Sequence, residues 1–263
     1  GTGGLPTLHL DIVMACYAFG WGKNGQLGID CSNVQEPIQI PNLKDRQIHG
    51  VAAGSRCTAA VTSSGQVYTW GKGDEGQLGH AATGGVLAPR IVEELASVKV
   101  VQVSCRGSHM AALDSAGKIW TWGENKEGQL GYTLRGSAPV RTSSSDKPTV
   151  VKSLQHKPMV SVCCGREFTA AISENGRLYT WGNGDDGQLG YEGDHSSGMP
   201  RRVNDLHEVQ MVACGSRHVL TLTSSGLFAW GWNAYGQVGN GDTKTVNQPF
   251  QLQVGMTVTH VAC

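Results

Sequence analysis

A phrase that begins with Trp-Gly and ends with Gly-Gln-Leu-Gly, or with Gly-Gln-Val-Gly in the last copy, occurs five times along the chain. The copies lie 49, 52, 59 and 49 residues apart and begin at Trp21, Trp70, Trp122, Trp181 and Trp230. They end at Gly28, Gly79, Gly131, Gly190 and Gly239. A period of this length is typical of proteins in which each repeat is one structural unit that packs on its neighbours. We therefore predict that these ten residues are structural.

A second phrase precedes the last four copies and consists of two short apolar runs separated by a turn. Between the two phrases stands a residue pair that ends in glycine, namely Ser64-Gly65, Ala116-Gly117, Asn175-Gly176 and Ser225-Gly226. Such pairs between β-prone runs predict hairpin turns, because glycine adopts positive φ angles without a steric cost. Each unit ends in a β-prone piece with a proline, which suits an edge strand because proline has no amide proton for a ladder.

Four strands per unit make one blade, and blades repeated radially make a β-propeller, so we predict an all-β fold. A helical bundle is excluded, since 37 of the 263 residues are Gly and each internal Gly costs a helix about 1 kcal/mol relative to Ala. We expect a single propeller domain over residues 1–263. Its repeats are predicted at approximately 1–48, 49–100, 101–159, 160–209 and 210–258, with the start of a further repeat at 259–263.

The two phrases, Trp-Gly-x-[Gly/Asn]-x-x-Gly-Gln-Leu-Gly and [Ala/Cys]-Gly-x-x-x-Thr-Ala-Ala, closely resemble the repeat of the regulator of chromosome condensation (RCC1) family. The resemblance covers the chain from about Tyr17 to Cys263. It implies a propeller of seven blades, whereas five Trp-Gly phrases are present. Because two more blades need roughly a hundred residues, we expect the chain to be a piece of a larger ring.

The resemblance leaves the function open. The founding member of the family is a guanine-nucleotide exchange factor for the small GTPase Ran that also docks on chromatin. Other members include a plant ultraviolet-B receptor, propellers of ubiquitin ligases, and organellar proteins linked to RNA processing or ribosome assembly. A fold shared by such different proteins does not select one activity.

We expect a protein-interaction module that binds a protein partner through loops on one face of the ring. One alternative is a regulator or guanine-nucleotide exchange factor of a small GTPase, and another is an organellar RNA- or ribosome-associated factor. The 21 Lys and Arg residues balance the 21 Asp and Glu residues. A zero net charge weakens the case for nucleic acid or chromatin as the main partner, although a local basic face would still permit it.

The chain shows no signal for membrane insertion or secretion. No apolar run approaches the roughly 18 residues that a membrane-spanning helix needs. The first ten residues lack the basic and apolar regions of a signal peptide. We expect an intracellular protein of the nucleus or cytoplasm, with an organelle as the alternative.

Motifs that resemble chemical sites are better explained by the repeat, so we predict no catalytic residue, cofactor or metal. Residues 71–76 and 182–187 match Gly-x-Gly-x-x-Gly, but no helix is expected after them to receive a phosphate. One repeat position accepts either alanine or cysteine, which indicates a small apolar site rather than a metal ligand. It is occupied by Ala53, Cys105, Cys164, Cys214 and Cys263.

A second repeat position holds Cys57, His109, Phe168 and His218. A position that accepts Phe does not serve a repeated catalytic or metal-binding role. We expect these side chains to pack in the core, with histidine bonded to a neighbouring blade.

Departures from the repeat are the candidates for partner binding. Arg56 and Arg217 share one position of the turn in the second phrase, and Arg106 and Arg166 lie in the same turn region. These residues predict scattered positive charge on one face, with a solvated rim as the alternative for each arginine.

The remaining candidates lie in two loops. Trp232 and Tyr235 stand where other copies carry small or charged residues, and exposed aromatic side chains are typical contact anchors. Packing on the neighbouring blade is the alternative. Arg135 and Arg141 lie in a polar, Ser-rich insertion at 133–148, which we interpret as a loop that either binds a partner or has no role.

Overall fold

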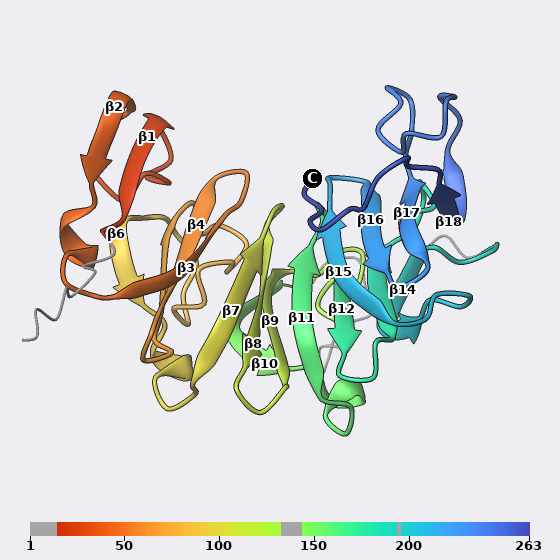
Figure 1. Ribbon diagram of the computed structural model, residues 1–263. Coiled ribbons are helices and arrows are strands. Elements are labelled where there is room, and N and C mark those ends of the chain that lie inside the picture. Colours follow the sequence, from red (N-terminus) through yellow and green to blue (C-terminus); the bar gives the residue numbers. More distant parts are fainter. Residues whose placement is uncertain (1–14, 133–143, 194–195) are drawn as a thin grey trace, which may run out of the picture.

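The computed structural model describes residues 15–132, 144–193 and 196–263. They form one two-stranded and four four-stranded antiparallel sheets (Figure 1). The two-stranded sheet consists of β1 (Tyr17–Trp21) and β2 (Asn33–Gln39). The first two complete blades consist of β3 (Ile48–Ala53), β4 (Cys57–Thr62), β5 (Val67–Gly71) and β6 (Val86–Ile91), and of β7 (Val100–Cys105), β8 (His109–Asp114), β9 (Ile119–Glu124) and β10 (Ser144–Val150).

The next two blades repeat this pattern. They consist of β11 (Met159–Cys164), β12 (Phe168–Ser173), β13 (Leu178–Asn183) and β14 (Ser196–Arg202), and of β15 (Val209–Cys214), β16 (His218–Thr223), β17 (Gly226–Gly231) and β18 (Val246–Leu252). The described helical segments are three single 3₁₀ turns, η1 (Pro41–Leu43), η2 (Glu93–Leu95) and η3 (Lys152–Leu154). No helix in the described part of the chain is long and apolar enough to cross a membrane.

Consecutive strands pair in each sheet, so every blade is a simple meander. The glycine pairs join the second and third strands, as predicted, and Gly117 (φ 75°) and Gly176 (φ 68°) adopt the left-handed conformation that these turns need. The predicted edge role of proline is also confirmed. The fourth strand of each blade, or β2 in the two-stranded sheet, contains Pro37, Pro89, Pro148, Pro200 or Pro249.

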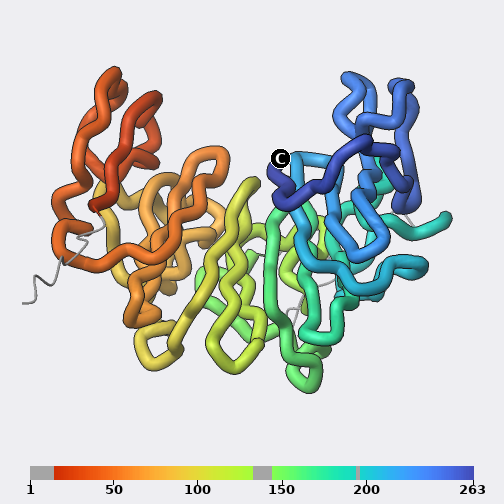
Figure 2. Tube along the Cα trace, viewed as in Figure 1, coloured from red at the N-terminus to blue at the C-terminus, as the bar shows by residue number. Residues whose placement is uncertain are grey.

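The sheets stand side by side in an arc (Figure 2). The first strands β3, β7, β11 and β15 contact one another in series and therefore form the inner wall. The prediction of a β-propeller with four-stranded blades is confirmed, and the described sheets do not close into a ring.

The repeated tryptophans bind each blade to the one before it. Trp70, Trp122, Trp181 and Trp230 are at most 1% exposed. Each indole N–H donates to a main-chain carbonyl of the preceding unit at 2.8–3.1 Å, and the acceptors are Gln26, Gln77, Gln129 and Gln188. Trp21 is 54% exposed, because no described sheet precedes it. The same side chain is therefore a core residue only where a neighbouring blade covers it.

The glycine that closes each phrase is required by this packing. Gly131 has φ 76°, and a Cβ atom there would lie 2.8 Å from Nε1 of Trp181. Gly79 and Gly190 stand in the same relation to the tryptophan of the following blade. Positive φ and close approach of an indole both exclude a side chain. The phrase thus encodes the contact between blades.

Candidate interaction surface at the inner turns

Four turns lie together at one end of the inner wall because the strands that they follow are neighbours. They join the first and second strands of the complete blades at residues 54–56, 106–108, 165–167 and 215–217, and we call them the inner turns. Each inner turn carries one arginine of the predicted set: Arg56, Arg106, Arg166 or Arg217. Residues up to 161 positions apart in sequence are thereby gathered on one face.

Main-chain bonds hold the inner turns in place. Ser55 donates to the Arg106 carbonyl oxygen from its N–H at 2.7 Å and from its Oγ at 2.8 Å. Arg166 N–H donates to the Ser216 carbonyl oxygen at 3.1 Å. All three bonds link one blade to the next, so the arginines project from a fixed frame rather than from independent loops.

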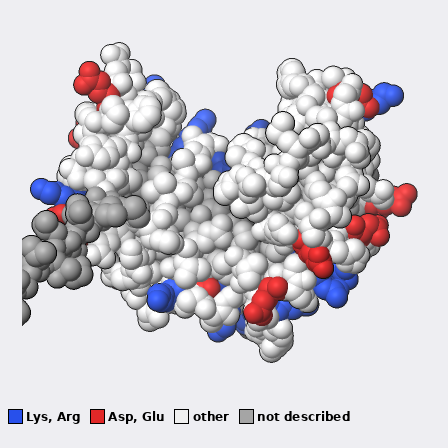
Figure 3. All heavy atoms as spheres, viewed as in Figure 1, with Lys and Arg blue, Asp and Glu red and all other residues white. Residues whose placement is uncertain are grey.

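The inner turns surround a cavity of about 450 Å³. Its charged lining residues are Arg56, Lys72, Arg106, Arg166, Glu124 and Glu167. The four basic groups exceed the two acidic groups by two positive charges, in a chain whose net charge is zero. Figure 3 shows a hollow between the two ends of the arc, with Lys and Arg side chains along its inner edge. An anionic group of a partner would be attracted to this surface.

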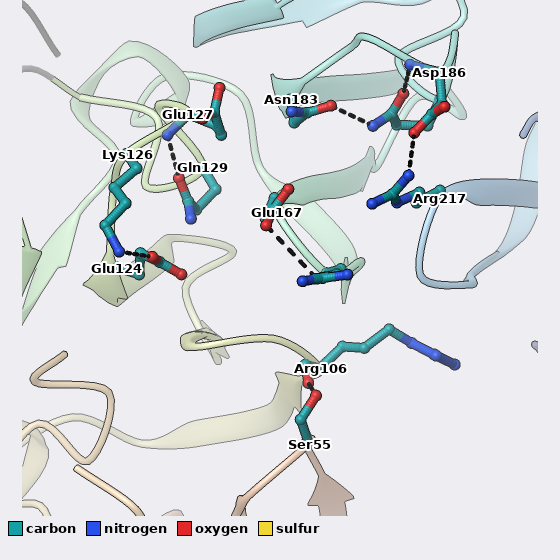
Figure 4. Close-up of polar contacts among 12 residues, drawn as sticks. Ser55, Arg106, Glu124, Lys126, Glu127, Gln129, Glu167, Asn183, Asp186 and Arg217 are labelled. Carbon is teal, nitrogen blue, oxygen red and sulfur yellow. Dashed lines mark hydrogen bonds and ion pairs between the residues drawn. The ribbon is translucent and has the colours of Figure 1, made fainter. Parts of the chain in front are cut away.

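The arginines differ in how strongly they are engaged (Figure 4). Arg166 Nε lies 3.6 Å from a carboxylate oxygen of Glu167, and Arg106 Nη2 donates to the Cys263 main-chain oxygen at 2.9 Å. Arg56 is exposed and makes no ion pair or side-chain hydrogen bond with any described residue. Exposed pairs of this kind contribute at most about 1 kcal/mol, so a partner carboxylate can replace them.

Arg217 belongs to the rim of this surface and connects it to the predicted aromatic residues. Its guanidinium lies 3.2 Å from Asp186 and 5.9 Å from the ring centroid of Trp232. Trp232 packs edge-to-face against Tyr235, with ring centroids 5.3 Å apart. Tyr235 is 85% exposed, so its ring is free to contact a partner. Trp232 is half-buried, and its ring contacts with Arg217 and Tyr235 lie within its own blade.

Three charged residues of the cavity, Lys72, Glu124 and Glu167, were not among the sequence candidates. Lys72 and Glu124 directly follow a Trp-Gly pair. The main-chain N–H of Lys72 donates to the Arg56 carbonyl oxygen, and that of Glu124 to the Ser108 carbonyl oxygen, both at 2.8 Å. This bond places the residue after Trp-Gly beside the inner turn of its own blade. The position of these residues in the repeat, directly after Trp-Gly, could therefore have predicted their place beside the inner turns.

His109 is fully buried behind the inner turns. Its Nε2 lies 2.9 Å from Oγ1 of Thr169 in the next blade, as expected from the repeat position. Thr169 uses its only hydroxyl proton on the Gln129 carbonyl oxygen, so Nε2 of His109 carries a proton and donates. Nδ1 has no partner among the described residues, and burial lowers the pKa of His109 to about 4. The ring is neutral at physiological pH.

His109 is more buried than His218 because the following blade covers it, whereas no described sheet follows the blade of His218. The two rings also differ in direction. In the other blades a glycine precedes this position by three residues, and at Gly165 and Gly215 the ring of Phe168 or His218 occupies the space that a Cβ would take. Arg106 has a side chain at that place, so the His109 ring turns into the seam between blades. One departure from the repeat therefore places a cation on the surface and a neutral imidazole beneath it.

The other sequence candidates are placed as follows. Arg135 and Arg141 lie outside the described residues. The first Gly-x-Gly-x-x-Gly match is a pair of tight turns, with Gly76 N–H bonded to the Gly73 carbonyl and Gly79 N–H to the Gly76 carbonyl, both at 3.0 Å. Strand β6 rather than a helix follows it. Over residues 15–132, 144–193 and 196–263 there is no cluster of three or more His, Cys, Asp or Glu that could hold a metal.

Comparison with known proteins supports the repeat assignment. The regulator of chromosome condensation (RCC1) repeat matches residues 15–61, 64–113, 116–172, 175–222 and 224–263. The human E3 ubiquitin-protein ligase HERC2 is 35% identical over 270 residues, which cover all of this chain and 5% of HERC2. The ultraviolet-B receptor UVR8 of Arabidopsis thaliana is 36% identical over 242 residues, which cover 90% of this chain and 53% of UVR8.

The fold agrees with a solved structure of the same architecture. Prp20p from Saccharomyces cerevisiae, studied for its binding to Gsp1p and histones, superposes with a TM-score of 0.79 at 25% identity. The match covers 92% of this chain and 60% of that one. The chain thus spans a small part of HERC2 and somewhat more than half of the other two proteins.

Proposed function

Because the chain belongs to the regulator of chromosome condensation (RCC1) repeat family, we propose that it is a propeller module that binds a protein partner through the inner turns. The observation that carries this proposal is the gathering of Arg56, Arg106 and Arg166 around one cavity. The three residues stand at different positions of the repeat, so the repeat itself does not require them. A partner with acidic side chains fits the excess positive charge of this surface.

Tyr235 and Trp232 extend the proposed surface at its rim. Aromatic and arginine side chains are the residue types that contribute most to protein interfaces, and here both types lie side by side. Arg217 is the link, since it contacts both Asp186 and the Trp232 ring. We expect charge attraction at the cavity and apolar contact at the rim.

Quantitative affinity purification with the tagged chain as bait tests the proposal. The variant Arg56→Ala/Arg106→Ala/Arg166→Ala removes the three arginines that line the cavity. A control variant, Lys118→Ala/Lys152→Ala/Arg177→Ala, removes the same charge from exposed residues away from the inner turns. A partner that binds through this surface is depleted at least tenfold with the first variant and is retained with the second. Equal recovery with both variants contradicts the proposal.

A second candidate function is regulation of a small GTPase, which the likeness to Prp20p supports. Release of a fluorescent GDP analogue from Ran-class and other small GTPases, measured with and without the chain, tests it. Acceleration that is lost in the Arg56→Ala/Arg106→Ala/Arg166→Ala variant supports exchange activity through the inner turns. No acceleration with any GTPase excludes exchange by this chain and leaves the interaction proposal standing.

A further inference from the structure

Thiols join the inner strands of neighbouring blades. At three successive seams the last residue of one inner strand donates its S–H to a main-chain oxygen of the preceding inner strand, and Cys263, which lies outside the strands, makes the same contact with β15. The pairs are Cys105 to Ala52 (3.3 Å), Cys164 to Ser104 (3.4 Å), Cys214 to Cys163 (3.8 Å) and Cys263 to Ala213 (3.4 Å). The residue that supplies the main-chain oxygen is Ala52, Ser104, Cys163 or Ala213. Among these four contacts of the described residues, both partners are cysteines only between β11 and β15.

The contacts at that seam bring Cys163 and Cys214 close together. The main-chain N–H of Cys214 donates to Sγ of Cys163 at 3.3 Å. The preceding seam has the same arrangement with oxygen in place of sulfur, since Cys164 N–H donates to Ser104 Oγ at 2.9 Å. Each cysteine side chain thus contacts the main chain of the other residue, so the two thiols are neighbours, which is the first condition for a disulfide.

The two thiols differ in reactivity. Cys163 is partly exposed, whereas Cys214 is buried. When Cys163 is ionised, the Cys214 thiol can donate to its sulfur instead of to the main-chain oxygen; this interaction, the Cys214 N–H and the nearby Arg106 guanidinium lower the pKa of Cys163 against the opposing effect of burial. Burial raises the pKa of Cys214 well above its ordinary value. Because the thiolate is the nucleophile, Cys163 reacts first and Cys214 is the adjacent second thiol.

We propose that Cys163 and Cys214 form a peroxide-sensitive pair that closes to a disulfide between two blades. The Cys163 thiolate attacks one oxygen of a hydroperoxide, an S–O bond forms, the O–O bond breaks, and the alkoxide or hydroxide leaves and takes up a proton. Sulfur is oxidised to a sulfenic acid, and the peroxide is reduced. The Cys214 sulfur then attacks the Cys163 sulfur, the S–S bond forms, the S–O bond breaks, and water leaves with the Cys214 proton.

Neighbouring thiols are expected to stay reduced. Cys57 and Cys105 contact each other, but both are buried. Donation to Cys57 and burial raise the pKa of Cys105. Cys164 is buried on the other face of β11, and burial raises its pKa as well. Neither the Cys57–Cys105 pair nor Cys164 offers an exposed thiolate to a peroxide. Cys263 is exposed, but desolvation of its thiol raises its pKa to about 11.

The disulfide would lie directly beneath the candidate interaction surface. Cys163 and Cys214 each stand three residues before the arginine of their inner turn, Arg166 and Arg217. A covalent link between β11 and β15 would fix the spacing of these two turns. Its formation does not depend on any partner, so the chemistry is testable on the isolated chain.

Peptide mapping after oxidation provides the test. The whole chain is treated with hydrogen peroxide, free thiols are blocked with N-ethylmaleimide, and tryptic peptides are analysed by mass spectrometry. We expect the peptide that holds Cys163 and Cys164 to be joined to the peptide that holds Cys214. The link is lost in Cys163→Ser and retained in Cys164→Ser. In Cys214→Ser, dimedone traps the sulfenic acid on Cys163.

The preceding seam supplies a matched gain-of-function variant. Ser104→Cys places two thiols at the equivalent register and is expected to add a link to Cys164. The exposed Cys31 reports that the peroxide dose was sufficient. Three results overturn the proposal: a link that depends on Cys164, a link between Cys57 and Cys105 in its place, or no link at a dose that oxidises Cys31.

Discussion

Replacement of His109 by Leu is expected to remove a large part of the acid sensitivity of the fold. The buried ring donates one hydrogen bond from Nε2 and leaves Nδ1 without a partner among the described residues. Protonation of Nδ1 would place an unpaired charge between two blades, which is why burial lowers the pKa of His109 to about 4. Leu has a volume similar to that of His and does not titrate. Any change in packing caused by the substitution therefore alters the free energy of unfolding equally at every pH.

The size and sign of the effect follow from linkage. The ordinary pKa of histidine is 6.5, and a pKa of about 4 in the folded chain corresponds to a difference in stability of roughly 3 kcal/mol. Above pH 6.5 the ring is neutral in both the folded and the unfolded chain, and the stability is fully present. As the pH falls from 6.5 to 4, the unfolded chain binds a proton that the folded chain does not, so stability is lost across this range.

Urea unfolding followed by tryptophan fluorescence at pH 7.5, 6.5, 5.5 and 4.5 measures the effect. The free energy of unfolding of the wild type, relative to that of His109→Leu, should fall by up to about 1.4 kcal/mol per pH unit below 6.5. His207→Leu, at an exposed histidine, is the control for the substitution itself. If His109→Leu and the wild type lose stability in parallel between pH 6.5 and 4.5, the account of His109 as a buried neutral ring is wrong.

The remaining predictions concern the seams between blades. Gly131→Ala is expected to destabilise the chain by about 1–3 kcal/mol, because its φ is positive and the Trp181 indole leaves no room, whereas Gly198→Ala should change stability by less than about 0.5 kcal/mol. Trp181→Phe is expected to cost at least about 1 kcal/mol, since it removes the bond to the Gln129 carbonyl oxygen. Trp21→Phe, at an exposed ring, should cost less than about 0.5 kcal/mol. Urea unfolding measures all four, and equal costs within either pair would contradict the packing described for the seams.

Much of the fold could be predicted from the sequence because its determinants are local. Turn glycines, edge prolines and alternating apolar runs recur in register, and each constrains the backbone independently of distant residues. The same signals predicted that Trp70, Trp122 and Trp181 are structural. The exposure of Trp21 was not predicted, because burial of this residue depends on a neighbouring blade rather than on the phrase.

The candidate site was predictable only in part. The four arginines were selected as departures from the repeat, but their convergence depends on the order in which the inner strands pack. Lys72 was missed, because the main-chain bond that places it beside Arg56 is not apparent from residue types. The direction of the His109 ring is related to the side chain of Arg106, which stands where the other blades have glycine, so two positions of one turn are connected. The sequence pattern predicts the backbone of the turns, but it does not predict the direction in which each side chain points, and the candidate site depends on that direction.

Site-specific photo-cross-linking tests whether the inner turns bind a protein partner. A benzophenone amino acid is placed at Ser108 or Ser216 in the inner turns, or at Ser153 away from them as the control, and the irradiated adducts are identified by mass spectrometry. We expect the two inner-turn positions to capture the same protein, and the Arg56→Ala/Arg106→Ala/Arg166→Ala variant to reduce both adducts at least tenfold. Capture of that protein only from Ser153, or adducts that the triple variant leaves unchanged, would contradict a partner-binding role for the inner turns.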